Sequence, residues 1–406
     1  MKILTVVKDL NKGGTQRGAQ NFCEGYRNLG HSSRIYALSD AGSRKSELNR
    51  QSIHIYANDA QETFDSIREW NPDIVHIHSH DMNISVVSRL KKILPNSKFI
   101  ETNVFSTLTD YTSLLDFSLQ LSNWCSYLYL SRGGTPDKLR IVPYPIKTDA
   151  FYRSDKRDVL AFKQKHGLPE DAFIFGRIGQ SYSGKWSLYL IDLFERFLSE
   201  VSENAYLLMV NPPSDIVHYT SSKSDILDKV VIIDTIRGDN NLRVCYSSID
   251  VFLHMAKQGE SFGMVLAESI LCETPVITLN TPWGDNSQKE VVEHNVNGYC
   301  ANTTSEFFSY MEDFYKGNLS LQASGRQGRK LIVDRYDHTF VASEALKVID
   351  KDSNYKVNFD VLLKRTYKNK ADRMLMISLL FIKYKIKKSN RIINFLLMKR
   401  FNVTYR

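Results

Sequence analysis

Short runs of β-branched and apolar residues alternate with amphipathic segments along most of this 406-residue chain. In the first part the apolar runs are ILTVV, RIYAL, IHIY, DIVHIH and KFIET, separated by helix-like segments such as TQRGAQNFCEGYRNL. Strands of this length joined by helices are typical of a parallel sheet wound by right-handed crossovers. We therefore expect an α/β domain in this part of the chain.

The same alternation begins a second time, with the runs FIFGRIG, AYLLMV, VVIID, DVFLHM and PVITL. Pro143 and Pro145 interrupt both the helix and the strand pattern between the two series. The chain is also too long for one ordinary hydrophobic core. The sequence predicts two α/β domains, a returning helix and a tail, over residues 1–145, 146–335, 336–354 and 355–406.

Composition and cysteine usage indicate a folded cytoplasmic protein. The chain is 42% hydrophobic and 24% charged, as in soluble globular proteins. Its five cysteines are scattered and odd in number, which is typical of reduced thiols in a cytosolic compartment. The apolar stretch before Lys8 is too short for the core of a signal peptide, so we expect no export.

The tail contains the positive charge of the chain. Residues 361–406 include 13 Lys and Arg and one acidic residue, Asp372. The apolar run MLMISLLFI is less than half of the roughly 20 residues needed to span a bilayer. Apolar and basic residues interleave in IKYKIKKSNRIINFLLMKRF, which favours an amphipathic helix on an anionic membrane surface. The alternatives are a helix packed on the protein itself or a nucleic-acid-binding tail; we expect no nucleic-acid partner.

The segment QGESFGMVLAESILCETPVI is the most informative for chemistry. We expect Glu260 in a loop after a strand, Ser261 as the N-cap of the following helix, and Glu268 on that helix. A helix start offers unpaired N–H groups to a phosphate or a sugar hydroxyl. The donors would be those of Phe262, Gly263, Met264 and Val265.

Two glutamates near a sugar site could also indicate a glycoside hydrolase. Eight residues at helical rise separate Glu260 from Glu268 by roughly 12 Å, beyond the window of about 5 to 9.5 Å that hydrolytic pairs occupy. The two carboxylates therefore have separate binding tasks, or they are ordinary exposed charges beside a helix.

Glu260 and Glu268 form an E-x7-E element, and the longer segment SSIDVFLHMAKQGESFGMVLAESILCETPVI resembles the signature of GT-B retaining glycosyltransferases of family 4. The resemblance extends over most of residues 1–345 and does not include the tail. It implies an α/β, GT-B architecture: two Rossmann-like domains that face each other across a cleft, with a nucleotide-sugar donor bound between them.

The resemblance also implies roles for individual residues. Glu268 would bind the ribose of the donor, and Glu260 would face the transferred sugar. In RIGQSYSGKWSLYLIDLF, Arg177 and Lys185 stand where the family has a basic pair that neutralises the donor diphosphate. Solvated loop charges are the alternative for that pair.

Two loops complete the expected donor site. Gly13 and Gly14 fall where the first strand leads into a helix, and the family has a similar Gly-Gly-x-x-Arg loop. This likeness implies donor contacts from Gly14 and Arg17, although a plain tight turn would look the same. We expect base recognition in the loop after VVIID, by Ile236 and Arg237.

The string HIHSHD places His76, His78 and His80 at alternate positions of a strand. No Cys, Asp or Glu cluster elsewhere completes a zinc site, so we expect no metal. His76 and His78 are predicted to be buried in the strand. His80 is expected at the carboxyl end of the sheet, where ligands bind in such folds.

The sequence departs from the family at three places. Asn103 stands where many members have a His that contacts the sugar; its amide can hydrogen-bond a hydroxyl and would orient the sugar together with Glu260, but it cannot act as a general acid. Trp186 replaces the glycine that follows the diphosphate-binding lysine. The family's Gly-Gly-x-x-Glu segment is reduced to Gly284-Asp285-Asn286 with Glu290, followed by Asn297-Gly298-Tyr299.

The function implied by the resemblance is metal-independent hexosyl transfer with retention, from a UDP- or GDP-linked sugar and without a cofactor. The tail suggests a lipid-linked acceptor in bacterial polysaccharide or lipopolysaccharide synthesis, at the inner face of the cell membrane. Alternatives are a nucleotide-sugar 2-epimerase and a non-catalytic GT-B protein that binds a nucleotide sugar or acts as a scaffold.

Overall fold

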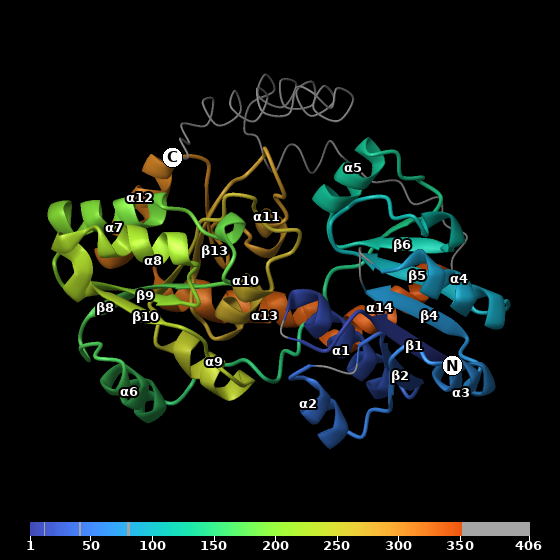
Figure 1. Cartoon of the computed structure of the whole chain (residues 1–406). Helices are drawn as coiled ribbons and strands as arrows, with labels where there is room; N and C mark the ends of the chain where they lie inside the picture. Colours follow the sequence, from blue (N-terminus) through green and yellow to red (C-terminus); the bar gives the residue numbers. More distant parts are fainter. Residues whose placement is uncertain (12, 40–41, 79–81, 351–406) are drawn as a thin grey trace. The chain divides into compact units, whose positions relative to one another are not determined.

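The computed structural model describes residues 1–11, 13–39, 42–78 and 82–350 (Figure 1). The chain forms two compact units. One consists of Met1–Lys147 and the segment that returns at Arg335, and the other is Thr148–Asp334. The chain leaves the first unit two residues beyond Pro145. The predicted tail lies outside the described residues.

The N-terminal unit alternates strands and helices as its apolar runs predict. Its elements are β1 (Lys2–Val7), α1 (Gly14–Asn28), β2 (Ser32–Ala37), α2 (Lys45–Arg50), β3 (Ile55–Ala57), α3 (Gln61–Trp70), β4 (Ile74–His78), α4 (Ile84–Ile93), β5 (Lys98–Asn103), η1 (Thr112–Leu114), β6 (Phe117–Gln120), α5 (Asn123–Ser131), β7 (Leu139–Ile141) and the returning α14 (His338–Asp350).

The C-terminal unit repeats this alternation. Its elements are α6 (Lys156–Lys165), β8 (Phe173–Ile178), η2 (Ser183–Lys185), α7 (Tyr189–Glu200), β9 (Ala205–Val210), α8 (Ser214–Ser221), η3 (Ser224–Lys229), β10 (Val230–Ile233), α9 (Asp239–Ser247), β11 (Val251–His254), α10 (Met264–Leu271), β12 (Val276–Leu279), α11 (Gln288–Val291), β13 (Gly298–Ala301), α12 (Thr304–Tyr315) and α13 (Leu321–Tyr336), which reaches the returning segment.

Each unit is built on one parallel sheet. In the described part of the chain the N-terminal sheet has the strand order β3-β2-β1-β4-β5-β6-β7, and the C-terminal sheet has the order β10-β9-β8-β11-β12-β13. The strand order reverses beside β1 in the first sheet and beside β8 in the second. Ligands of such sheets bind outside the carboxyl ends of the strands at this point of reversal. The predicted α/β class is confirmed.

Three strands were not predicted, namely β6, β7 and β13. They span four, three and four residues and include FSLQ and GYCA, which lack a sustained apolar run. Such short strands form because neighbouring strands offer ladder hydrogen bonds and helices cover their faces. The pairing partner, rather than the strand's own composition, decides their structure.

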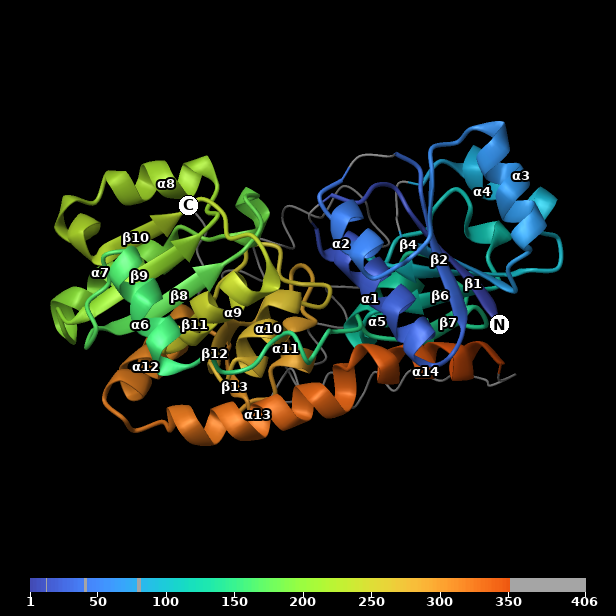
Figure 2. The same ribbon diagram turned by 90° about the horizontal axis from the view of Figure 1, so that it is seen from below.

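Alternate residues of the N-terminal sheet pack into two separate layers. Leu4 and Val6 of β1 lie in a cluster with side chains of α3 and α4, whereas Ile3 lies in a cluster with side chains of α1 and α14. Figure 2 shows α1 and α14 side by side along the sheet. The returning helix therefore completes the core of the first unit, although more than 180 residues of the other unit precede it in the chain.

Gly25 allows the close approach of α14 to α1. A Cβ at Gly25 would lie 2.4 Å from the carbonyl oxygen of His338 and 2.8 Å from the Cβ of Ala342. Replacing glycine by alanine in a helix interior normally stabilises the protein by about 1 kcal/mol. Here the added methyl group overpacks the contact between the two helices, so we expect the substitution to destabilise the protein.

We predict that Gly25→Ala lowers the free energy of unfolding of the N-terminal unit by about 1 to 3 kcal/mol, because overpacking costs this much in well-packed cores. Thermal denaturation of the purified full chain measures the change. A rise in melting temperature, as expected for alanine in an ordinary helix, would contradict the packing of α14 on α1.

Candidate active site

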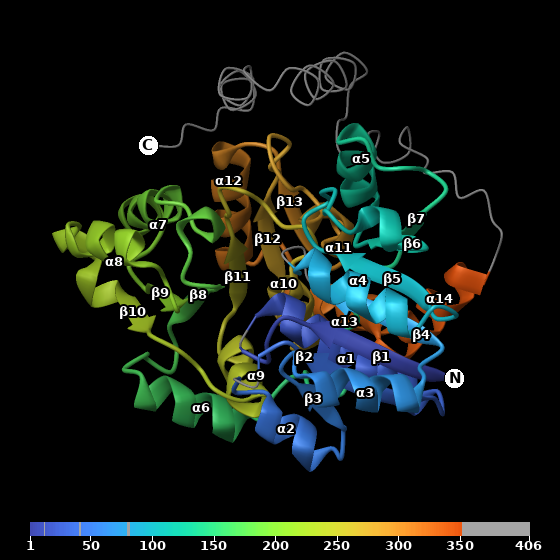
Figure 3. The same ribbon diagram turned by 45° about the vertical axis from the view of Figure 1, so that its right-hand side comes forward.

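The point of strand reversal in the C-terminal sheet lies between β8 and β11 (Figure 3). Arg177 is the penultimate residue of β8, and the loop with Glu260 follows the last residue of β11, His254. Lys185 ends the short helix η2 in the loop after β8. The parallel sheet therefore brings the predicted basic pair and Glu260 to the same edge.

Arg177 is a buried cation with free donor capacity. Its side chain is 1% exposed, and Nη2 donates to the Lys185 carbonyl oxygen at 2.5 Å. Nε and Nη1 have no hydrogen-bond partner among the described residues. Burial lowers the pKa of Arg177 to about 10, so the guanidinium is still charged at neutral pH. The expected alternative, a solvated loop charge, is therefore wrong for Arg177.

Glu260 is held by two side chains. Lys185 Nζ donates to its Oε2 at 2.7 Å, and His254 Nε2 lies 3.2 Å from its Oε1. Burial on its own would raise the pKa of Glu260, but Lys185 and His254 outweigh burial and hold the pKa well below its ordinary value. Glu260 is thus an ionised carboxylate, and the cluster with Arg177 and Lys185 has two cations for one anion.

The loops after β8 and β11 are joined through their backbones as well. Gln258 N–H donates to the Gly184 carbonyl oxygen at 3.0 Å, and Lys185 Nζ donates to the Gly259 carbonyl oxygen at 3.1 Å. Gln288 Oε1 accepts the N–H of Glu260 at 3.2 Å. These contacts hold the Glu260 backbone in place independently of the contacts of its side chain.

The helix after Glu260 begins later than predicted. The structure starts α10 at Met264 with Gly263 as its N-cap, so the prediction of Ser261 as N-cap and of a helix from Phe262 is wrong. Gly263 has a φ of 95°, a left-handed conformation that favours glycine and turns the chain into the helix. The helix start has no side-chain cap and no acidic residue in its first turn. The N–H groups at the start of this helix are therefore those of Met264 and Val265, whereas Phe262 and Gly263 precede it.

Glu268 lies in the second turn of α10 and is 4% exposed. Tyr246 donates its hydroxyl hydrogen to Glu268 Oε2 at 3.0 Å. Helix α10 packs on β11 and β12, so Glu268 stays in the same unit as Glu260. The two glutamates are held by different partners, and their separate binding tasks stay a prediction.

Trp186 explains one departure from the family pattern. Its ring is 1% exposed and lies 5.3 Å from the Arg177 guanidinium, and its Nε1 donates to the Gln180 carbonyl oxygen at 2.9 Å. The indole thus closes the loop of residues 179–186 on itself and covers one side of Arg177. A glycine at this position could do neither.

The expected base-recognition loop follows the edge strand β10. Ile236 is half-buried and Arg237 is exposed. Strand β10 is separated from β8 by β9, which at the usual strand spacing is about 10 Å. Base recognition by this loop stays a prediction.

The glycine loop of the N-terminal unit lies between β1 and α1, where the sequence predicts it. Gly13 is the N-cap of α1 and Gly14 is its first residue, with no acidic side chain in the first turn. The N–H of Arg17 donates to the Gly13 carbonyl oxygen at 3.0 Å, and the Arg17 side chain is half-buried. Donor contacts from Gly14 and Arg17 stay predictions.

The prediction that His76 and His78 are buried is confirmed, since both are fully buried on β4. His76 contacts the Tyr26 hydroxyl at 3.0 Å and the Thr102 hydroxyl at 2.9 Å. His80 lies outside the described residues. Among the described residues, no group of three His, Cys, Asp or Glu side chains is arranged to hold a metal ion.

Asn103 ends β5 and is 2% exposed, with its amide engaged inside the protein. Its Nδ2 donates to the Thr107 carbonyl oxygen at 2.8 Å and to Glu101 Oε1 at 3.0 Å, and its Oδ1 accepts the Thr107 N–H at 3.2 Å. Asn103 thus holds the turn after β5. A sugar contact by Asn103 stays a prediction.

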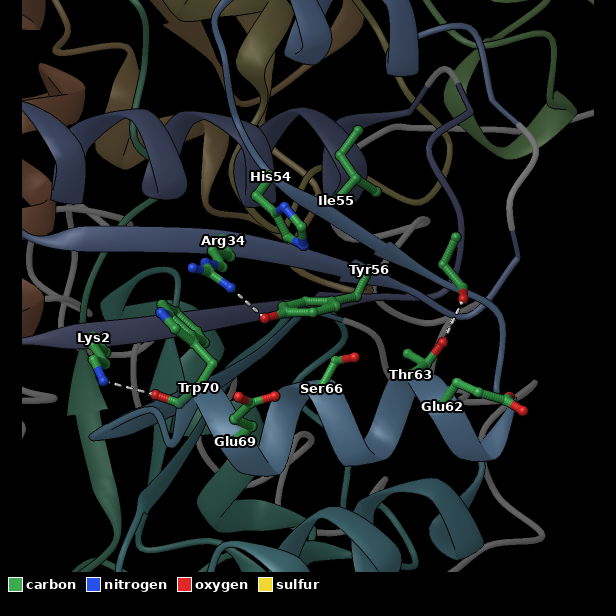
Figure 4. Close-up of a pocket in the computed structure, with 11 residues that line it drawn as sticks. Lys2, Arg34, His54, Ile55, Tyr56, Glu62, Thr63, Ser66, Glu69 and Trp70 are labelled. Carbon is green, nitrogen blue, oxygen red and sulfur yellow. Dashed lines mark hydrogen bonds between the residues drawn. The ribbon is translucent and has the colours of Figure 1, made fainter.

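A separate groove lies between β3 and α3 in the N-terminal unit (Figure 4). Arg34 donates to the Tyr56 hydroxyl and lies 4.4 Å from the Trp70 ring. Both rings are less than a tenth exposed, so they offer no open stacking surface. The groove follows the edge of the sheet and contains none of the predicted donor-binding residues, so we do not assign the donor to it.

Two comparisons with known sequences find matches to part of this chain. Residues 158–331 match the family model of the glycosyl transferases group 1. A D-inositol 3-phosphate glycosyltransferase from Stackebrandtia nassauensis is 27% identical over 152 residues, which is 35% of this chain. The match spans about a third of the length of that relative.

Solved structures show the same fold. The Anabaena protein HepE in complex with UDP and glucose has a TM-score of 0.69 at 15% identity, covering 86% of this chain and 100% of HepE. A glycosyltransferase from Rickettsia africae has a TM-score of 0.72 at 18% identity, covering 86% and 98%. The protein therefore has the GT-B fold of glycosyltransferases.

Sequence reasoning missed two titratable residues, His254 and Glu101. Glu101 is a polar residue inside an apolar strand and His254 ends one, and a polar residue in such a run is the signal that could have found them. Glu101 is 1% exposed and accepts hydrogen bonds from Ser118 Oγ at 2.6 Å and Asn103 Nδ2 at 3.0 Å. Burial raises the pKa of Glu101 to about 7, although these two hydrogen bonds oppose the shift.

Because the folded pKa of Glu101 exceeds its unfolded value, the folded chain binds the extra proton between about pH 4.5 and 7, and stability falls as pH rises through that window. In the wild type this rise in pH lowers the free energy of unfolding by an amount on the order of 2 to 3 kcal/mol. We predict that Glu101→Gln abolishes this pH-dependent loss of stability. The melting temperature of the wild type should fall relative to the variant between pH 5 and pH 8. The exposed Glu62→Gln serves as the control, and parallel pH profiles for wild type and Glu101→Gln would contradict the prediction.

Proposed function

We propose that this protein is a glycosyltransferase that moves a sugar from a nucleotide-sugar donor to an acceptor hydroxyl. The observation that carries the proposal is Arg177, a buried cation at the point of strand reversal with two nitrogens unpartnered among the described residues. Buried donors without partners are rare in folded proteins. A diphosphate is an anion that suits Arg177 and Lys185 together.

In the proposed reaction Arg177 and Lys185 stabilise the diphosphate as it leaves. The bond between the anomeric carbon and the β-phosphate oxygen breaks, the acceptor oxygen bonds to the same face of that carbon, and the acceptor proton moves to the departing phosphate. Fixed cations in a site with little water stabilise such developing charge strongly. The proposed mechanism retains the anomeric configuration and uses no metal and no side-chain nucleophile.

The two glutamates divide the recognition of the donor. We propose that Glu268, held by Tyr246, binds the ribose, and that Glu260, held by Lys185 and His254, faces the transferred sugar. Carboxylates accept hydrogen bonds from vicinal hydroxyls, which suits both tasks. A UDP-linked sugar is the first donor to test, because HepE is described in complex with UDP and glucose.

The proposal predicts donor-dependent release of nucleoside diphosphate. Purified full chain is incubated with UDP-, GDP- and ADP-sugars, with membrane extract as the acceptor source. Arg177→Ala should lower kcat about 100- to 1000-fold, because it removes a cation aimed at developing charge. Arg157→Ala, on a side chain that is 93% exposed in the same unit, is the matched control.

The glutamate variants test the division of tasks. Glu268→Gln should weaken UDP binding about tenfold, whereas Glu260→Gln should leave UDP binding intact and lower turnover of the sugar donor. Binding without turnover under all conditions would instead support a non-catalytic nucleotide-sugar-binding protein. Recovery of a donor with an inverted C2 hydroxyl would support a 2-epimerase.

We propose further that the acceptor is a lipid-linked saccharide in bacterial polysaccharide or lipopolysaccharide synthesis, and that the enzyme works at the inner face of the cell membrane. The support is the basic composition of residues 361–406. In the part of the chain that the structure describes, no helix combines the length and apolarity needed to cross a membrane.

Membrane docking predicts a dependence on tail charge. Each basic residue contributes about 1 kcal/mol at an anionic surface. Replacing Lys383, Lys385, Lys387 and Lys388 by Gln in the full chain should weaken binding to phosphatidylglycerol vesicles at least about tenfold. Cosedimentation measures this change, with phosphatidylcholine vesicles as the control. Equal binding of variant and wild type would overturn the proposal.

A further inference from the structure

His254 joins the sheet to the carboxylate of Glu260. It is the last residue of β11, it is fully buried, and it lies opposite Thr278 in the register of β11 and β12. Its Nδ1 lies 2.9 Å from the Thr278 hydroxyl oxygen, and its Nε2 lies 3.2 Å from Glu260 Oε1. Both ring nitrogens are therefore engaged, one on each side.

The partners decide which nitrogen has the hydrogen. A carboxylate oxygen can only accept, so Nε2 must donate to Glu260. A neutral ring then has a lone pair on Nδ1, and the Thr278 hydroxyl donates to it. With the opposite tautomer, a lone pair on Nε2 would face the negative charge of Glu260. The geometry thus selects the Nε2–H form.

The charges around His254 favour a neutral ring. Burial has the largest influence on its pKa, and the cations Arg177 and Lys185 act in the same direction, whereas Glu260 opposes them. Together they lower the pKa of His254 to about 4. A ring with this pKa is neutral at physiological pH and is not a proton donor in the reaction.

We propose that His254, held in place by Thr278 and fixed as the Nε2–H tautomer by the carboxylate that it faces, is the positioning residue that aims Glu260 at the transferred sugar. The sugar contact of Glu260 rests on the proposed glycosyltransferase function, whereas the tautomer and the orientation of Glu260 do not. Without the hydrogen bond from His254, Lys185 alone would hold the carboxylate through Oε2, and rotation about that contact would be free.

The first test needs no ligand. Nitrogen NMR of the full chain with 15N-labelled histidine, compared with His254→Gln to assign the signal, reports the tautomer and the charge of the ring. The expected result is a neutral Nε2–H ring at all values between pH 5 and pH 8. Titration near pH 6.5, or an Nδ1–H ring, would overturn the proposal whether or not the protein transfers sugar.

The second test separates sugar positioning from nucleotide binding. His254→Phe retains the ring volume and loses the donor, whereas His254→Gln retains an N–H group that can reach Glu260. With the donor found in the nucleotide-sugar screen, His254→Phe should lower kcat/KM about 10- to 100-fold, the effect of losing a hydrogen bond to a charged group. Its affinity for the free nucleoside diphosphate should stay close to that of the wild type, and His254→Gln should recover most of the loss.

Thr278 supplies a milder pair of variants in case His254→Phe does not fold. Thr278→Val removes the hydroxyl that holds the His254 ring at Nδ1, and Thr278→Ser retains it, so the valine variant should have the lower kcat/KM. Equal losses in the Phe and Gln variants, or equal losses of nucleotide and sugar-donor affinity, would show that His254 only supports the fold. If the protein binds no nucleotide, the proposed function fails while the NMR result still decides the tautomer.

Discussion

The ion pair between Lys185 and Glu260 joins the loop after β8 to the loop after β11, and the C-terminal site depends on this connection. The pair is partly buried, with the Lys185 side chain 23% and the Glu260 side chain 13% exposed, so removing one partner would leave the other charge without its counter-charge in a partly desolvated place. A backbone hydrogen bond from Gln258 to Gly184 and the bond from Lys185 Nζ to the Gly259 carbonyl oxygen join the same loops. The contact between them thereby keeps Glu260 close to the carboxyl end of β8, where Arg177 lies.

Arg177 in the C-terminal unit and Asn103 in the N-terminal unit both lie near the carboxyl end of a strand, but they differ in how their polar atoms are paired. At the point of strand reversal in the C-terminal sheet, Arg177 retains unpartnered donors among the described residues, and burial of such groups is unfavourable without a ligand. At the end of β5 in the N-terminal unit, Asn103 and Glu101 satisfy each other and the turn beside them. The first arrangement suits recognition of an anion, whereas the second suits the stability of a loop.

Much of the C-terminal site could be predicted from the sequence, because Glu260 and Glu268 lie in a segment that resembles a family signature. Arg177 and Lys185 likewise stand at the positions of that family's basic pair. The start of α10 could not be predicted, because it depends on the left-handed conformation of Gly263, and a serine before a helix pattern looks like a better cap. His254 could not be given a role either. Its two partners are 6 and 24 residues away, and no spacing rule connects them.

The sequence by itself determined the α/β class. It also predicted a division near Pro145 and residue types that suit a diphosphate. Apolar periodicity and proline act locally, so they can be read along the chain. Only the tertiary structure decided that α14 completes the first core, that β6, β7 and β13 are strands, and that Thr278, His254 and Glu260 form one chain of hydrogen bonds. Parallel pairing and helix packing join residues that are distant in the sequence, and their geometry exists only once both partners are in place.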